Sequence, residues 1–172
     1  MVKRIKYIIG ALLIFFVVLL VIFYNDIGVR KEDIESDARK FQGISDGWNS
    51  QIEVGEKVAA IIFYPDDYTE AIYSVYLNRS GTSLGFFFRG GGKINSVENG
   101  ICKFYIDEYN EVAYISLNRV GVCKIVIDDG ESVSSIDIDS QNPFAIVLPS
   151  NAGNVYFYNE QNEILEYIDY KL

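Results

Sequence analysis

The sequence predicts an all-β fold, an antiparallel β-sandwich of immunoglobulin-like type, preceded by one N-terminal transmembrane α-helix and a short helical stalk. Three observations lead to this class: a long uncharged run near the N-terminus, short apolar or alternating runs in the remainder, and turn-forming residues between those runs. The composition also favours strands, because Ile, Val, Tyr and Phe are abundant and only three residues are proline. A partly open β-barrel is the alternative arrangement of the same strands.

The first element is the run from Tyr7 to Tyr24, which contains no charged residue. Eighteen helical residues span roughly 27 Å, close to the hydrocarbon thickness of a bilayer. A soluble helix of this length needs a polar face, and this run has none. We therefore predict a transmembrane helix over residues 7–24.

The charges before this helix predict its orientation. Lys3, Arg4 and Lys6 lie in residues 1–6, and positive residues stay on the cytoplasmic side. The prediction is a single-pass cell-membrane protein with a cytoplasmic N-terminus and an extracytoplasmic C-terminal domain. A cleaved signal peptide is the alternative, but the apolar run exceeds the usual signal core of about 7–15 residues and no A-x-A site follows it.

Residues 25–47 are predicted to form the stalk, which is partly helical. Its apolar residues recur at helical spacing, charged residues fill the other positions, and glycines end the pattern. The apolar stripe consists of Ile27, Ile34, Ala38 and Phe41. A dimerising coiled coil is the alternative, although the stripe is shorter than the three or four heptads such a helix requires.

Residues 48–172 are predicted to form the β-domain, with eleven short strands and no intervening helices. Turn-forming groups such as Asp128-Asp129-Gly130 separate the strands, which is typical of an antiparallel sandwich or barrel. The run from Val58 to Phe63 is apolar at every position, so this strand is expected to be buried on both faces.

The charge and the missing histidine exclude several function classes. The chain carries a net charge of −9, and the 24 acidic and 12 basic residues after the first 24 positions give that part −12. A surface of this sign repels phosphates, so no nucleic-acid partner is expected. The absence of His removes the commonest general base and zinc ligand, and no metal site or cofactor is predicted.

Two cysteines lie in similar contexts, Gly-Ile-Cys102-Lys and Gly-Val-Cys123-Lys. Export permits a disulfide between them. If they lie on strands two apart, however, they are about 9.5 Å from each other, beyond the roughly 7 Å that a disulfide tolerates between Cα atoms. Two buried free thiols and a disulfide both stay open at this point.

An aromatic run followed by glycines is the most unusual segment. As a candidate surface for a ligand or partner it offers Phe86, Phe88, Arg89, Gly90, Gly91 and Gly92. It lacks the Gly-Lys-Ser/Thr ending of a phosphate-binding loop. The alternative is a core strand followed by a loose turn.

Acidic residues and tyrosines supply two further hypotheses. The loop acids Asp66, Asp67, Asp107 and Glu108 are candidates for a pair of catalytic carboxylates, which glycosidic cleavage needs about 5–9.5 Å apart in a cleft. The 13 tyrosines could form a sugar-stacking platform, an idea that the single Trp weakens. The acid pairs Asp66-Asp67, Asp128-Asp129 and Asp137-x-Asp139 lack the full spacing of an EF-hand calcium loop, so solvated turns are the simpler interpretation of these pairs.

The sequence thus favours a membrane-anchored, non-catalytic binding or interaction module of the cell envelope. Its partners would be the lipid bilayer, through residues 7–24, and an envelope protein or glycan. The alternatives are a carboxylate-based, glycosidase-like enzyme and a ligand-sensing ectodomain, the latter disfavoured because residues 1–6 leave little room for an output domain.

Overall fold

The computed structural model describes residues 9–10, 12–19, 26–79, 81, 84–93 and 100–172. Within these ranges residues 9–10 and 12–19 are helical, and a second helix and twelve strands form the folded domain. The elements of the domain are α2 (Ile34–Gln42), β1 (Asn49–Val54), β2 (Val58–Tyr64), β3 (Ile72–Asn78), β4 (Phe86–Lys93), β5 (Ile101–Tyr105), β6 (Glu111–Ser116), β7 (Val122–Asp128), β8 (Val133–Asp137), β9 (Phe144–Pro149), β10 (Asn154–Asn159), β11 (Ile164–Leu165) and β12 (Tyr167–Lys171).

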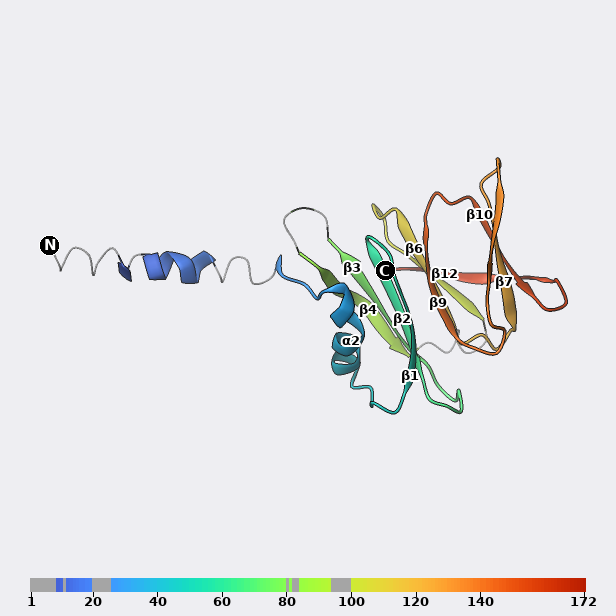
Figure 1. The fold of residues 1–172 in the computed structure, drawn as a ribbon, viewed down its shortest axis with the longest axis horizontal. Coiled ribbons are helices and arrows are strands. Elements are labelled where there is room, and N and C mark those ends of the chain that lie inside the picture. The colour runs from blue at the N-terminus through green and yellow to red at the C-terminus, as the bar shows by residue number, and fades with distance from the viewer. Residues whose placement is uncertain (1–8, 11, 20–25, 80, 82–83, 94–99) are drawn as a thin grey trace.

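The strands form three four-stranded sheets that lie in successive layers (Figure 1). The proximal sheet, nearest to residues 26–29, has the order β1-β2-β3-β4; the central sheet has the order β12-β5-β6-β9; the distal sheet has the order β11-β10-β7-β8. All strand pairs are antiparallel except β12 with β5. The mainly β, mainly antiparallel prediction is confirmed at this level, but the two-sheet immunoglobulin-like arrangement is not, because a third sheet is present.

The proximal and central sheets enclose the first core cluster. From β2 it takes alternate residues such as Ala60 and Ile62, and from β6 it takes Ala113 and Ile115, all fully buried. The intervening residues of β2, including Ile61, face the other way and are equally buried. Every residue of β2 is therefore buried, as the uninterrupted apolar run from Val58 to Phe63 predicts.

A second interface lies between the central and distal sheets. Val112 and Tyr114 of β6 point away from the first cluster and pack with Ile125 and Phe157 of the distal sheet. The central sheet therefore has a core on each face, and β6 contributes to both. This arrangement makes the central sheet the structural middle of the molecule.

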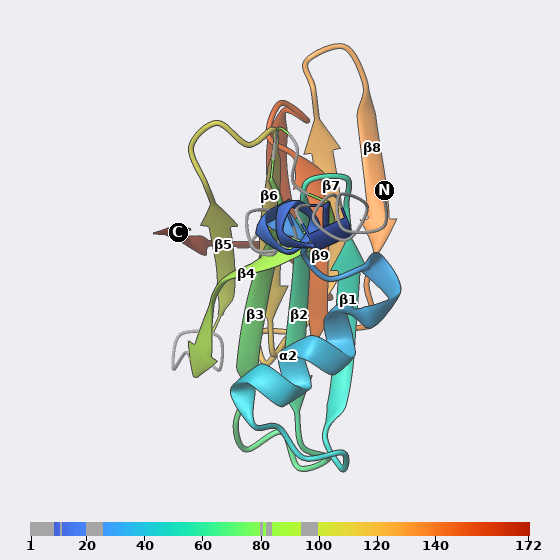
Figure 2. The same cartoon turned by 90° about the vertical axis from the view of Figure 1, so that its left-hand side faces the viewer.

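Helix α2 covers the outer face of the proximal sheet (Figure 2). Ile34 and Ala38 are fully buried against that sheet, whereas Phe41, the last residue of the predicted apolar stripe, is 64% exposed. The helix ends at Gly43, whose φ of 67° is left-handed and whose N–H donates to the Arg39 carbonyl. The helical part of residues 25–47 is therefore a packed layer of the domain.

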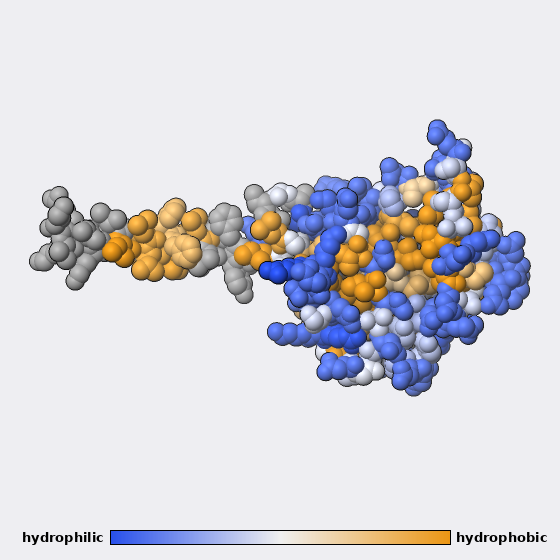
Figure 3. All heavy atoms as spheres, viewed as in Figure 1, coloured by the Kyte–Doolittle hydropathy of each residue, from blue (hydrophilic) through white to orange (hydrophobic). Residues whose placement is uncertain are grey.

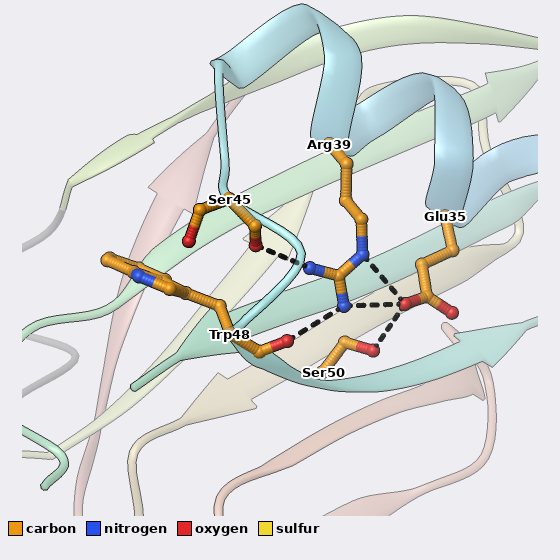
Figure 4. Close-up of polar contacts among 5 residues, drawn as sticks. All are labelled: Glu35, Arg39, Ser45, Trp48 and Ser50. Atoms are coloured by element: carbon orange, nitrogen blue, oxygen red, sulfur yellow. Dashed lines mark hydrogen bonds and ion pairs between the residues drawn. The ribbon is translucent and has the colours of Figure 1, made fainter. Parts of the chain in front are cut away.

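Arg39 fastens the helix to β1 through a set of hydrogen bonds (Figure 4). Its guanidinium donates to Glu35 at 2.8 Å, to the Ser45 carbonyl at 3.2 Å and to the Trp48 carbonyl at 3.0 Å. Ser50 of β1 donates to the same Glu35 carboxylate at 2.7 Å. The Ser50 hydrogen bond, opposed by partial burial and reinforced by Arg39, lowers the pKa of Glu35, so this acceptor stays charged.

The predicted transmembrane run is described only in part. Residues 9–10 and 12–19 are helical, and their apolar side chains are exposed, with Ile14 at 67% and Phe15 at 62%. Residues 7, 8, 11 and 20–24 lie outside the described residues. Among the helices that the structure describes, none combines the length and the apolar character needed to cross a membrane.

Candidate functional site

A cleft of about 650 Å³ opens where the central and distal sheets diverge at one end. Four chain segments meet there: β5 with the turn that follows it, β6, the β9–β10 connection with the start of β10, and β11 with the start of β12. The volume lies within the range of small-ligand sites, about 300–1,000 Å³. The lining includes five tyrosines: Tyr105, Tyr109, Tyr114, Tyr156 and Tyr167.

The inner part of the cleft continues the second core interface. The Tyr114 ring lies 5.1 Å from the Phe157 ring and 5.6 Å from the Tyr167 ring, centre to centre. Burial raises the pKa of Tyr114, and the nearby Tyr167 and Asp169 raise it further. Tyr114 therefore remains a neutral phenol at physiological pH, set among aromatic faces.

The charges at the cleft are mostly acidic. Among the described residues Lys103 is the single basic residue of the lining, and its ammonium lies 3.2 Å from Asp169 and 5.2 Å from the centre of the Tyr167 ring. The acidic lining residues are Asp107, Glu108 and Glu166. Because Lys103 is already paired with a carboxylate, the cleft disfavours an anionic ligand and suits a neutral, polar one with an apolar face.

Glu108 has an unusual backbone at the rim of this cleft. It occupies the turn closed by the Tyr109 N–H and the Ile106 carbonyl, and its φ is 73°. This position normally takes Gly or Asn, because a larger side chain pays a cost of about 1–2 kcal/mol in the left-handed region. This strained backbone at the rim of the cleft makes Glu108 a candidate functional residue.

The acids singled out from the sequence separate into two groups. Asp107 and Glu108 line the cleft, and Asp107 forms an ion pair with Lys171. Asp66 and Asp67 lie in the β2–β3 turn, where Asp66 accepts from Asn49 and Asp67 accepts from Thr69. The two hydrogen bonds from Thr69 lower the pKa of Asp67, which is the behaviour of a solvated turn residue.

The aromatic and glycine-rich segment is not a strand followed by a flexible loop. Its glycines belong to strand β4 itself. Phe86 is 2% exposed in the core beneath α2, and Phe88 packs on the exposed Phe41 ring at 4.2 Å. Arg89 is exposed at a bulge between two paired stretches, and the three glycines continue the edge strand β4.

Packing explains two of these glycines. A Cβ on Gly90 would lie 3.2 Å from the Leu172 side chain, and one on Gly91 would lie 2.2 Å from Gln42 and 2.6 Å from the Tyr73 carbonyl. Position 91 therefore has no room for a Cβ beside the Tyr73 carbonyl, and a Cβ at position 90 fits only if the flexible Leu172 side chain shifts slightly. The role of Phe86, Phe88, Arg89, Gly90, Gly91 and Gly92 as a ligand or partner surface stays a prediction.

The two cysteines lie in different sheets and are not bridged to each other. Cys102 is buried in the first core cluster, between the proximal and central sheets, whereas Cys123 is half-buried on β7 of the distal sheet. The structure contains no Cys102–Cys123 disulfide. In the part of the chain that the structure describes, no group of three His, Cys, Asp or Glu side chains is arranged to hold a metal ion.

In the sequence the cleft tyrosines stand out only as part of a general excess of tyrosine, and nothing there distinguishes Lys103, Glu166 or Tyr167. A signal was present for the turn, because Asp107 and Glu108 were chosen as loop acids. Nothing in the sequence shows that this turn meets β10 and β11, since that meeting depends on the third sheet.

A scan of family models finds no match to this chain, and neither a curated protein nor a solved structure matches it. The geometry and chemistry of the cleft are therefore the basis for assigning a function.

Proposed function

We propose that the chain is a membrane-tethered binding module that works outside the cell and holds a neutral glycan in the cleft between its central and distal sheets. The observation that carries this proposal is the cleft itself: about 650 Å³, lined by five tyrosines, with its one cation already paired. Sugar rings present flat apolar faces that stack on tyrosine, and their hydroxyls suit neutral phenols and carboxylates.

The tether is residues 7–24, an uncleaved signal-anchor with residues 1–6 in the cytoplasm. The exposed, apolar helical residues 9–10 and 12–19 support it, because such a surface is costly in water. Two measurements test it: the chain should stay in the membrane pellet after an alkaline wash, and protease added outside intact cells should degrade the β-domain. A mature chain free in the medium, beginning after Tyr24, contradicts the tether.

The binding test uses the whole chain in nanodiscs and titrates it calorimetrically with chitohexaose and with cellohexaose, two uncharged oligosaccharides. Tyr156→Ala removes a cleft wall residue and should weaken binding about tenfold, the equivalent of roughly 1.4 kcal/mol. Tyr158→Ala is the matched control: Tyr158 is half-buried two residues later on β10, but it does not line the cleft. Both variants should unfold at similar temperatures.

Two outcomes contradict this assignment. If the folded chain binds neither oligosaccharide, or if Tyr158→Ala weakens binding as much as Tyr156→Ala, the cleft is not a glycan site. The second candidate, a carboxylate-based hydrolase, is favoured by the acids at the rim of the cleft. It predicts that shorter sugars are released from the probe and that Glu108→Gln stops this release while binding persists.

A further inference from the structure

The chain between the predicted anchor and α2 is hydrogen-bonded to the edge of the proximal sheet. The Gly28 N–H donates to the Leu84 carbonyl at 2.6 Å, and the Leu84 N–H donates to the Asp26 carbonyl at 2.8 Å. Val29 and Phe86 exchange two further bonds, each of 2.7 Å. Residues 26–29 are thus attached to the start of β4 along their whole length.

Two glycines permit this close attachment. A Cβ on Gly28 would lie 2.5 Å from the Phe86 carbonyl oxygen, and a Cβ on Gly85 would lie 2.7 Å from the Val29 carbonyl oxygen. Gly85 also has a φ of 90°, which larger residues rarely adopt. The backbones touch here, so residues 26–29 are held as part of the domain.

Large apolar side chains project from the same place. Ile27 is 65% exposed and Leu84 is 70% exposed, and their backbones are paired in an isolated parallel β-bridge. Figure 3 shows apolar atoms beside the point where the chain enters the domain, in addition to those of residues 12–19. Because such surface is unfavourable in water, these two side chains favour an apolar environment.

The length of the chain limits how far these residues can lie from the bilayer. Ile27 follows Tyr24 by three residues, which span at most about 10 Å when fully extended. The polar layer on each side of the hydrocarbon core is about 5–7 Å thick. If residues 7–24 cross the membrane, Ile27 and its bridge partner Leu84 are therefore within or beside this layer.

We propose that the end of the proximal sheet next to residues 26–29, here called its base, rests on the bilayer that holds the anchor, with Ile27 and Leu84 inserted among the lipid headgroups. This inference rests on the proposed tether and not on the glycan site. The contact is apolar and not electrostatic: Arg30 is opposed by Glu32 at 3.9 Å, and the Arg79 guanidinium lies over the Phe87 ring at 4.1 Å. It should therefore form on zwitterionic lipid and need no anionic lipid.

The orientation that follows keeps the cleft away from the membrane. The layers succeed one another from the junction as α2 with the proximal sheet, the central sheet and the distal sheet (Figure 1). Because the cleft lies between the last two sheets, a domain resting on its base presents the cleft to the exterior.

The test places an NBD fluorophore at one cysteine of the whole chain, in phosphatidylcholine nanodiscs containing doxyl-labelled lipid. Cys102→Ala with Cys123→Ser provides the background, and Leu84→Cys carries the label. The expected result is blue-shifted emission that doxyl lipid quenches, with no gain in quenching when half the lipid is phosphatidylglycerol. A label at Glu131→Cys, in the β7–β8 turn, should emit as in water and escape quenching.

Two further variants make the result decisive. Ile27→Asn should reduce quenching at position 84, whereas Val133→Asn, which alters an equally exposed residue of β8, should not. A label at Val17→Cys reports the anchor separately. Quenching at 17 without quenching at 84 overturns the resting contact and leaves the tether intact, while a label at 17 that escapes quenching overturns the tether.

Discussion

At the scale of single residues, Glu111 joins two sheets through one carboxylate. It begins β6 in the central sheet and accepts the N–H groups of Glu56, Lys57 and Val58, at 2.8–2.9 Å, from the β1–β2 turn of the proximal sheet. Burial opposes the charge, but the three donors, with Lys31 nearby, outweigh it and lower the pKa of Glu111. The fold therefore stabilises the ionised form of this group.

The expected result for Glu111→Gln is a loss of about 1–3 kcal/mol in the free energy of unfolding at pH 7, because a charged acceptor of three hydrogen bonds is replaced by a neutral one. The sign with pH follows from the lowered pKa. The contribution of Glu111 is complete above its unfolded value of about 4.5 and disappears as pH falls through the lower folded pKa.

Denaturant titrations between pH 3 and pH 7 measure this effect. The difference between the natural chain and Glu111→Gln should shrink as the pH falls below about 4.5. Glu131→Gln, in an exposed turn, is the control and should have little effect at any pH. A difference that persists unchanged at pH 3 would show that shape, and not charge, is what matters at this position.

At the scale of elements, the hydrogen bonds of Arg39 help to hold α2 on the proximal sheet. Lys in its place keeps the charge but cannot reach Glu35 and two carbonyls at once, nor lie flat over the Phe63 ring, which the guanidinium faces at 4.9 Å. We expect Arg39→Lys to cost about 1–2 kcal/mol in the free energy of unfolding.

Trp48 fluorescence tests this prediction, because the Trp48 carbonyl is one of the acceptors and Trp48 is the one Trp of the chain. Its fluorescence should change in the folded state of Arg39→Lys. Lys40→Arg, an exposed neighbour, should leave both stability and emission as they are. Equal behaviour of the two variants would mean that the helix is held by Ile34 and Ala38 alone.

The strands also show how much of the fold can be predicted from the sequence alone. Period-two alternation and turn residues predict most strands within a few positions, and the apolar run of β2 predicts its burial on both faces. The glycine-rich part of β4 looks like a loop in sequence, because the close packing at Gly91 comes from another strand, through the Tyr73 carbonyl of β3. Local pattern cannot show contacts made by distant segments.

The same limit explains the missed third sheet and the cleft. Alternation marks one wet face on a strand, but it does not say which other strand covers the dry face. The cleft needs β5, β6, β10 and β11 to meet, and each supplies residues that are ordinary by themselves. Only the turn acids Asp107 and Glu108 stood out beforehand.

At the scale of the whole molecule, the central sheet couples the other two because each of its faces belongs to a core. A cavity at the distal interface should therefore weaken the entire domain. Phe157→Leu, at a fully buried site, should lower the free energy of unfolding by roughly 1–2 kcal/mol. Trp48 packs on the opposite side of the molecule, beneath α2, and reports whether the loss reaches that far.

In a denaturant titration, the Trp48 transition and the far-ultraviolet circular dichroism transition of Phe157→Leu should move together to lower denaturant, with the same midpoint. Cooperative unfolding requires this, since losing the distal sheet leaves Val112 and Tyr114 of β6 exposed and removes half of the support for that strand. If the Trp48 midpoint stays in place while the dichroism transition splits, the distal sheet unfolds on its own. The cleft, which needs both sheets, would then open before the part of the domain attached at residues 26–29 is lost.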